Sequence, residues 1–530
     1  MKKTYGDAVG HFKKTISYSV FIDLFEVALT LGLASIIGNF SNAIFNRDTE
    51  YVVQNLWYLI ACVLINVIIV PLICYWGDTI CIKEAIKYDV FMFYRFLNLP
   101  YEKSSKIPIG EVKARLESDV IMFRNSIILI ITKAITVPLA LAGIIFLMAN
   151  INIIYMLITV ALSLIVLIVP YFTKRLSAKY DDETRQYQAQ ESTLCYDLII
   201  LAPFIKLYRL GKTLLSEYRS VFDDFRNKTQ KKAILLKSLC ENVSAVLAVL
   251  SNILVLIFGA YFLSIKLISA GDILAMAGFY TALLTSMENI GFIISRSALL
   301  KKLEERVAFF YDRDATIALD NTSAGLIPLT ANKVSYSIDG KCILKPISFK
   351  IYPHQKVAII GKNGTGKTTL LNIITGLYKT YDGSIAAENV ELKELSDNVL
   401  SEKYSFVSQS PFVFKGTVRE NILLGCDTED REKTDHVMKA VGIYDINERV
   451  VNTKADNLSG GELQRISLAR ALLRDRPVII MDEPSNHLDH TCIEWIKEYI
   501  KTCNKTILYV THDKDLIASA DAVIDLDKNQ

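Results

Sequence analysis

The sequence predicts a multidomain protein in which an all-α domain of six membrane-spanning helices precedes an α/β domain. The apolar runs of the 530-residue chain lie almost wholly before Ser297, and charged, glycine-containing sequence follows about Leu326. From Leu329 onward, short β-rich runs such as KVAIIG and VIIMDE alternate with helical stretches, which is typical of a largely parallel sheet. We therefore expect a transmembrane domain over 1–312, a linker over 313–326 and a second domain over 327–530.

Each of six apolar runs in the first domain reaches the roughly 20 residues that a helix needs to cross a bilayer. The runs occupy 17–45, 51–80, 126–149, 151–173, 238–264 and 272–296. The connections after the first and third runs are short and poor in positive charge, whereas 81–125 and 174–237 are long, basic and helical in pattern. Because basic loops stay in the cytoplasm, we expect a multi-pass cell-membrane protein, surrounded by lipid, with both termini and the second domain in the cytoplasm.

The composition gives no support for nucleic-acid binding, for a disulfide framework or for a zinc site. The net charge of +3 gives no sign of a nucleic-acid partner, and we expect none. The nine cysteines are scattered without a CxxC pair, so the sequence predicts neither a disulfide framework nor a zinc site.

The sequence predicts a phosphate-binding loop in the second domain. Gly361–Thr368 matches GxxxxGK[ST] in full, between the strand-like KVAII and the helical TTLLNIITGL. Glycines allow backbone N–H groups to surround phosphates, and the helix N-terminus adds a favourable dipole. We expect Lys367 to contact the β and γ phosphates and the Thr368 hydroxyl to bind Mg²⁺. The predicted nucleotide contacts are Gly361, Lys362, Asn363, Gly364, Thr365, Gly366, Lys367, Thr368 and Thr369.

Two acidic residues end the run VIIMDE, Val478–Glu483. A buried strand delivers such carboxylates to its carboxyl end, where α/β sheets bind ligands. Asp482 is placed to hold Mg²⁺, directly or through water. Glu483 is a candidate general base for an attacking water.

A second anion site is predicted where LSGGELQR, Leu458–Arg465, opens a helix. Small residues at a helix start expose N–H groups, so Ser459, Gly460, Gly461 and Glu462 are further candidate nucleotide contacts. Since one domain already carries a phosphate loop, this second site is best explained if it serves the nucleotide of a partner.

Together these motifs resemble those of the ATP-binding cassette (ABC) proteins, over about 327–530. Gly361–Thr368 is similar to their Walker A motif, Val478–Asp482 to Walker B and Leu458–Glu462 to the signature loop. In FVSQSPF, SNHLD and YVTHD, the residues that resemble the Q-loop, D-loop and switch positions are Gln409, Asp489 and His512.

This resemblance implies ATP and Mg²⁺ as cofactors and ATP hydrolysis coupled to transport as the activity. The catalytic residues would be Glu483, His512 and Gln409, the Mg²⁺ ligands would be Thr368, Gln409 and Asp482, and Asp489 would join the nucleotide contacts.

The resemblance extends into the first domain. In FLNLPYEKSSKIPIGEVKARLESDV, Gly110, Arg115 and Asp119 carry a pattern similar to the one that follows the first coupling helix of ABC exporters. Six spans joined to one cassette is the layout of an exporter half-transporter. In that family two cassettes enclose two ATP molecules, and each site combines one subunit's Walker A motif with the other's signature loop. The resemblance therefore implies a dimer, for which a homodimer suffices while a heterodimer stays open.

Two departures from the family pattern concern the cassette. The adenine-stacking position falls on Ile338, with Tyr336 two residues earlier, so either side chain is a candidate adenine contact. The Thr-x-Val-Gly-Glu-like segment that exporters usually carry before the signature loop is poorly matched by INERVVNTKADNLSGG, in which Glu448 and Arg449 approximate it.

Three ionisable residues in the predicted spans bear on the cargo. Asp23, Glu26 and Glu288 fall in predicted spans, and ionisable groups at membrane depth usually face a cavity or a partner. One hypothesis has them line a pathway for a cationic or polar substrate, and the alternative is that they sit at the interface or in ion pairs. The predicted function is export of a peptide or other amphipathic small molecule from the cytoplasm by alternating access. Lipid or drug efflux, and an ATP-gated membrane sensor or immunity protein without net transport, are the alternatives.

Overall fold

The computed structural model describes residues 2–166, 183–184, 187, 191, 195–196, 198–225, 230–311, 326–338, 340–388, 390–426 and 430–528. The chain divides into two compact units, one formed by 1–97 and 109–312 and the other by 98–108 and 313–530. The segment 98–108 thus belongs to the second unit, which contains the predicted cassette and is called the cassette unit below, although its sequence neighbours on both sides belong to the first unit. Apart from Leu326, the predicted linker 313–326 is not among the described residues, because the description stops at 311 and resumes at 326.

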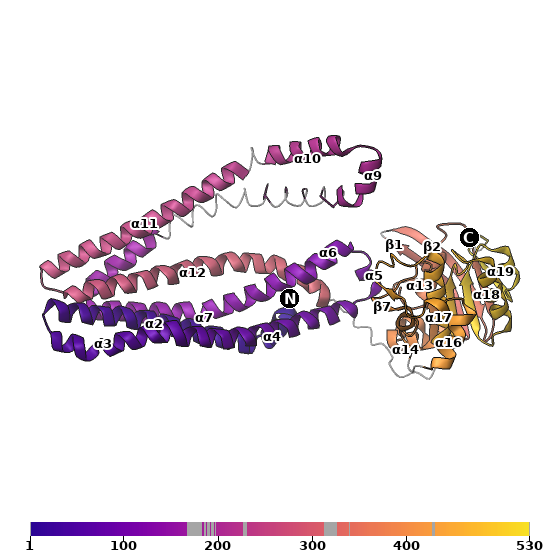
Figure 1. Ribbon diagram of the computed structural model, residues 1–530, viewed down its shortest axis with the longest axis horizontal. Coiled ribbons are helices and arrows are strands. Elements are labelled where there is room, and N and C mark those ends of the chain that lie inside the picture. Colours follow the sequence, from indigo (N-terminus) through magenta and orange to yellow (C-terminus); the bar gives the residue numbers. More distant parts are fainter. Residues whose placement is uncertain are drawn as a thin grey trace. The chain divides into compact units, whose positions relative to one another are not determined.

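Long helices build the first unit (Figure 1). Its described α-helices are α1 (Lys2–His11), α2 (Lys13–Phe45), α3 (Thr49–Leu64), α4 (Val70–Leu97), α6 (Ile109–Ala114), α7 (Val120–Ile151), α9 (Ala202–Leu207), α10 (Gly211–Phe225), α11 (Lys231–Ser264) and α12 (Ala270–Ala308). Short helical turns η1 (Ile65–Ile69), η2 (Arg115–Asp119) and η4 (Phe309–Tyr311) join or end them.

Five of the described helical segments are long and apolar enough to cross a membrane. They are Lys13–Phe45, Thr49–Leu97, Ile109–Ile151, Asn242–Ser264 and Ala270–Tyr311. These segments coincide with five of the six predicted runs. The fourth run, 151–173, begins with the shorter apolar helix Ile153–Val166, and its residues after 166 lie outside the described part of the chain.

Helices α2 and α12 approach each other along small residues. A Cβ atom added to Gly38 would lie 2.9 Å from the Gly271 carbonyl oxygen, and one added to Gly278 would lie 2.6 Å from the Ala34 Cβ. The Asn42 side-chain oxygen accepts a hydrogen bond from the Gly271 N–H at 2.6 Å. Lipid provides no hydrophobic drive for helix association, so close backbone approach and polar contacts of this kind hold spans together. The pairing also makes the two helices antiparallel.

The second unit contains two main sheets. An antiparallel sheet has the order β2-β1-β4-β5, and a parallel sheet has the order β11-β3-β10-β9-β6, beside a small β7-β8 pair. The strands are β1 (Leu329–Ile338), β2 (Lys341–Ile351), β3 (Lys356–Ile360), β4 (Asp382–Ala387), β5 (Val390–Glu391), β6 (Tyr404–Val407), β7 (Gly416–Thr417), β8 (Val450–Val451), β9 (Val478–Asp482), β10 (Thr506–Val510) and β11 (Ala522–Asp525).

The described helices of this unit lie between its strands, apart from the short helix in the segment 98–108. They are α5 (Tyr101–Ser104), α13 (Lys367–Ile374), α14 (Asp397–Lys403), α15 (Val418–Ile422), α16 (Arg431–Ala440), α17 (Gly460–Leu473), α18 (His490–Thr502) and α19 (Lys514–Ala518), with the 3₁₀ turns η5 (Leu392–Glu394) and η6 (Tyr444–Ile446). Strands β9 and β10 are buried along their whole length, as expected of parallel strands covered on both faces.

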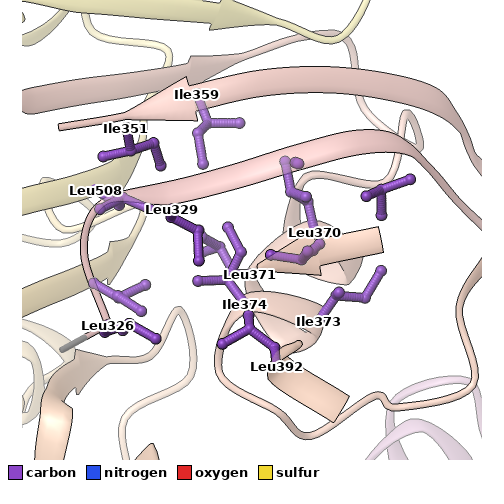
Figure 2. Close-up of a cluster of buried hydrophobic side chains, with 14 of the residues drawn as sticks. Leu326, Leu329, Ile351, Ile359, Leu370, Leu371, Ile373, Ile374, Leu392 and Leu508 are labelled. Carbon is purple, nitrogen blue, oxygen red and sulfur yellow. The ribbon is translucent and has the colours of Figure 1, made fainter. Parts of the chain in front are cut away.

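One hydrophobic core holds the phosphate-loop helix against the sheets. Leu370, Leu371, Ile373 and Ile374 of α13 pack among strand residues that include Ile359 of β3 (Figure 2). Because β3, β10 and β9 are neighbours and parallel, their carboxyl ends meet at one edge of the sheet. The segments that follow these strands are therefore brought together there.

Candidate functional site

The phosphate loop joins β3 to α13 through three glycines with positive φ. Gly361 has φ +155°, Gly364 +85° and Gly366 +93°. A Cβ atom at Gly366 would lie 2.9 Å from the Ile343 carbonyl oxygen, so only glycine fits without a shift of backbone. The loop is braced from within, because the Thr365 hydroxyl donates to the Lys362 carbonyl oxygen at 2.9 Å. The loop therefore has the positive φ angles and the helix start that the motif requires, and phosphate binding stays a prediction.

Lys367 and His512 meet inside this loop. The buried Lys367 ammonium donates to the carbonyl oxygens of Gly361 at 2.7 Å and Lys362 at 3.1 Å. It also lies 3.0 Å from His512 Nε2. Since an ammonium group can only donate, Nε2 is the acceptor and the ring proton sits on Nδ1. The histidine predicted from YVTHD, after β10, therefore contacts the lysine that is predicted to bind phosphate.

The predicted Mg²⁺ ligands of Walker A and Walker B are also adjacent. The Thr368 hydroxyl donates to Asp482 Oδ2 at 3.0 Å. Burial raises the pKa of Asp482, and the neighbouring Glu483 carboxylate raises it further, whereas Thr368 and Lys367 oppose the shift. A hydroxyl and a carboxylate oxygen at one point, in a site that disfavours uncompensated negative charge, suit a hard divalent cation such as Mg²⁺.

Glu483 is held by two amide side chains. Gln409 Nε2 donates to Glu483 Oε2 at 3.1 Å, and Asn486 Nδ2 donates to the same oxygen at 2.6 Å. Glu483 itself has φ +49°, an uncommon conformation for a non-glycine residue. Since Gln409 uses its nitrogen here, its side-chain oxygen is the atom left for the predicted Mg²⁺ contact. Sequence reasoning missed Asn486, although its position three residues after the predicted base was a usable signal.

The signature loop forms a capped helix start. Ser459 is the N-cap of α17, and its Oγ accepts from the Glu462 N–H at 3.2 Å while Glu462 Oε2 accepts from the Ser459 N–H at 2.7 Å. A Cβ atom at Gly461 would lie 2.8 Å from the His487 carbonyl oxygen, so the D-loop backbone packs directly on this turn. The predicted D-loop residue Asp489 caps α18 and accepts from Arg465 Nη2 at 2.7 Å.

The two candidates for adenine contact have different surroundings. Tyr336 is only 3% exposed, and its ring stacks on Tyr378 with centroids 4.9 Å apart. Burial, with the Glu102 carboxylate nearby, raises the pKa of Tyr336 to about 12, so its hydroxyl stays a donor. The ring of Tyr336 is therefore already covered by Tyr378, which favours Ile338 of the two predicted adenine contacts. Ile338, half-buried at the end of β1, stays as the predicted contact.

A buried carboxylate fixes the segment 98–108 within the cassette unit. Glu102 of α5 is 8% exposed, and its Oε1 accepts from the Thr380 N–H at 3.1 Å and from the Thr380 hydroxyl at 2.8 Å. Tyr336 Oη lies 3.4 Å from the same oxygen. Tyr101 also stacks on Tyr378, with ring centroids 6.0 Å apart. The predicted coupling helix is thus attached by specific polar and aromatic contacts.

The three carboxylates predicted at membrane depth divide into two kinds. Asp23 Oδ2 accepts from Lys133 Nζ at 2.7 Å and from the Thr136 hydroxyl at 3.3 Å, so it joins α2 to α7 as an ion pair. Glu26 and Glu288, on the packed helices α2 and α12, are exposed. Asp23 therefore forms an ion pair, as the alternative hypothesis holds. The hypothesis that ionisable side chains line a substrate pathway now concerns only Glu26 and Glu288.

Comparison with known proteins places both units in one family. A family model described as the ABC transporter transmembrane region matches residues 16–287, more than half of the chain, and one described as ABC transporter matches residues 344–486. The chain therefore belongs to the ABC transporter family. It is a multi-pass membrane protein whose ATP-binding unit is cytoplasmic.

Two curated relatives illustrate the range of the similarity. The lactococcin-G-processing and transport ATP-binding protein of Lactococcus lactis subsp. lactis is 28% identical over 315 residues, which are 57% of this chain and 45% of that protein. The beta-(1→2)glucan export ATP-binding/permease protein of Brucella suis biovar 1 is 28% identical over 335 residues, which are 59% of this chain and 55% of that protein. The match thus spans about half the length of these relatives.

A solved structure shares the whole fold. The structure of a bacterial Atm1-family ABC exporter with ATP bound superposes with a TM-score of 0.79 at 17% identity, covering 98% of this chain and 94% of that one. At this identity the likeness establishes the fold alone.

Proposed function

We propose that this chain is an ATP-driven exporter half-transporter that works as a dimer. The observation that carries the proposal is the attachment of 98–108 to the cassette unit. This segment follows one candidate span, Thr49–Leu97, and precedes another, Ile109–Ile151, yet its Glu102 is buried against Thr380 of the cassette. A chain in which two membrane helices are joined through the nucleotide-binding unit can transmit cassette movement to those helices.

Hydrolysis in this proposal divides among side chains that already touch one another. Lys367 supplies positive charge to the β and γ phosphates, beside His512. Glu483, oriented by Gln409 and Asn486, accepts a proton from a water whose oxygen bonds to the γ phosphorus while the bond to the bridging oxygen breaks and ADP leaves. Mg²⁺, held by Thr368 and Asp482 when bound, would neutralise phosphate charge.

The second predicted anion site supports the proposed dimer. The N-terminal turn of α17 presents the Gly460 and Gly461 backbone, and Ser459 caps it. In one chain the phosphate loop already serves one nucleotide, so the α17 turn serves the nucleotide of a second subunit. Glu483, His512 and the signature residues are all present, so a homodimer suffices and a heterodimer is the alternative.

The cargo we propose is a peptide or other amphipathic small molecule. One relative is named for lactococcin-G processing and transport and the other for glucan export, so relatives of this kind differ in what they handle. Glu26 and Glu288 favour a cargo that carries positive charge, because carboxylates at membrane depth face a cavity or a partner.

Uptake into inside-out vesicles tests the proposal. The purified full-length chain is reconstituted, and ATP-dependent accumulation of cationic peptides, neutral peptides, lipids and lipophilic drugs is measured, with Glu483→Gln as the blank. Accumulation of one class that the blank lacks supports export and names the class. ATP hydrolysis without accumulation of any class would favour the sensor alternative or a missing partner subunit.

A further inference from the structure

The signature loop of this chain carries a carboxylate in the first turn of α17. Glu462 closes the capping box of this helix, and its Oε2 accepts from the Ser459 N–H at 2.7 Å. The Gly460 and Gly461 N–H groups of the same turn are the ones that would receive a phosphate. A glutamate beside that position places negative charge against a polyanion, which weakens binding unless a cation compensates it.

Arg449 supplies this cation. Its Nη1 donates to Glu462 Oε1 at 2.9 Å, so the two Glu462 oxygens are divided between the capping box and the arginine. Hydrogen bonding from the Ser459 backbone, opposed by partial burial and reinforced by Arg449, lowers the pKa of Glu462, which keeps it ionised. The side chains are 39% and 27% exposed, so the pair is only partly screened by solvent.

Arg449 is itself fixed by its backbone. Its N–H donates to the Ile446 carbonyl oxygen at 3.0 Å, and its own carbonyl oxygen accepts from the Val418 N–H at 3.0 Å. The following residues form β8, which pairs with β7, and Asn457 Nδ2 donates to the Val450 carbonyl oxygen at 2.8 Å. Residues 449–457 are therefore held by hydrogen bonds between the start of α15 and the signature loop. Arg449 forms the ionic contact of this segment with that loop.

We propose that Arg449 is a positioning residue for the signature loop: by pairing with Glu462 it neutralises this carboxylate and lets the α17 turn accept a phosphate of the partner subunit's nucleotide. The proposal rests on the dimer of the proposed function. It also assigns a role to the segment that poorly matches the Thr-x-Val-Gly-Glu-like pattern of exporters. In this chain the segment carries a basic residue, Arg449, which pairs with the acidic residue of the signature loop, Glu462.

The test is a double-mutant comparison in the reconstituted full-length protein. The KM for ATP and the kcat of hydrolysis are measured for wild type, Arg449→Met, Glu462→Gln and Arg449→Met/Glu462→Gln. Arg449→Met should raise the KM about fivefold when Glu462 is present and less than about twofold in the Glu462→Gln background, because only the first background leaves an uncompensated charge. An equal rise in both backgrounds, or no rise in the first, would overturn the proposal.

Lys454→Met is the matched control, since it removes one exposed positive charge from the same segment and should leave the KM within about twofold of wild type. If Arg449→Met does not fold, the neutral Arg449→Gln replaces it in both backgrounds, and the same two KM ratios are compared. An equal rise in both backgrounds, or no rise when Glu462 is present, would again overturn the proposal. Wild-type hydrolysis no faster than in Glu483→Gln would instead refute the proposed function itself.

Discussion

Replacement of Glu102 by alanine should separate ATP hydrolysis from transport. Two hydrogen bonds of normal length, from the Thr380 N–H and hydroxyl, end on this carboxylate, while the Tyr336 hydroxyl is more distant at 3.4 Å. Hydrogen bonds to a charged group contribute at least about 1.5 kcal/mol each, so their loss weakens attachment of α5 by about 3 kcal/mol. This free energy corresponds to a change of about 100-fold in the attached population.

The assay is the amount of cargo accumulated per ATP hydrolysed in inside-out vesicles. Glu102→Ala should lower this ratio at least about fivefold, while ATP hydrolysis without cargo stays within about twofold of wild type. Glu117→Ala is the matched control from the same connection, because Glu117 is 63% exposed and its Lys113 contact of 3.8 Å is a surface ion pair. A Glu102→Ala protein with a wild-type ratio would refute the reasoning that α5 transmits cassette movement.

Three further predictions concern the nucleotide and cargo sites. Asn486→Ala removes the side chain that donates to Glu483 at 2.6 Å, so it should lower the kcat of ATP hydrolysis about tenfold with little change in the KM for ATP. Single-turnover hydrolysis checks this, and a change in the KM alone would contradict it. Gly366→Ala should abolish binding of a fluorescent ATP analogue, because its Cβ meets a carbonyl oxygen, whereas Gly340→Ala, at φ +78° in open space, should keep binding at a cost of about 1 kcal/mol in stability. Glu288→Gln should weaken accumulation of a cationic peptide about tenfold and leave accumulation of a neutral peptide unchanged. If the variant and the wild type accumulated the cationic peptide with the same affinity, a pathway role for Glu288 would be excluded.

Local sequence patterns were enough to predict the phosphate loop. The spacing of Gly361, Gly366 and Lys367 requires positive φ and a helix start, and both occur in the structure. The adjacency of Thr368 and Asp482 also followed, since the ends of neighbouring parallel strands meet at one edge.

Contacts between distant parts of the chain could not be predicted in this way. Glu102 lies 278 residues from Thr380 and 234 from Tyr336, and no local pattern marks it as buried. The stacking of Tyr378 on Tyr336 is likewise not marked by any local pattern, so in the sequence the tyrosine looked free to stack on adenine. The pairing of Arg449 with Glu462 is closer in sequence but depends on the turn that β7 and β8 impose.

Whether transport depends on the hydrolytic site is measured by uptake of cargo into inside-out vesicles, compared between wild type and Glu483→Gln. We expect ATP-dependent accumulation of one chemical class by the wild type and none by the variant, in which the group that takes the proton from water is gone. Equal accumulation in both proteins would contradict it, because transport would then not depend on the hydrolytic site described above.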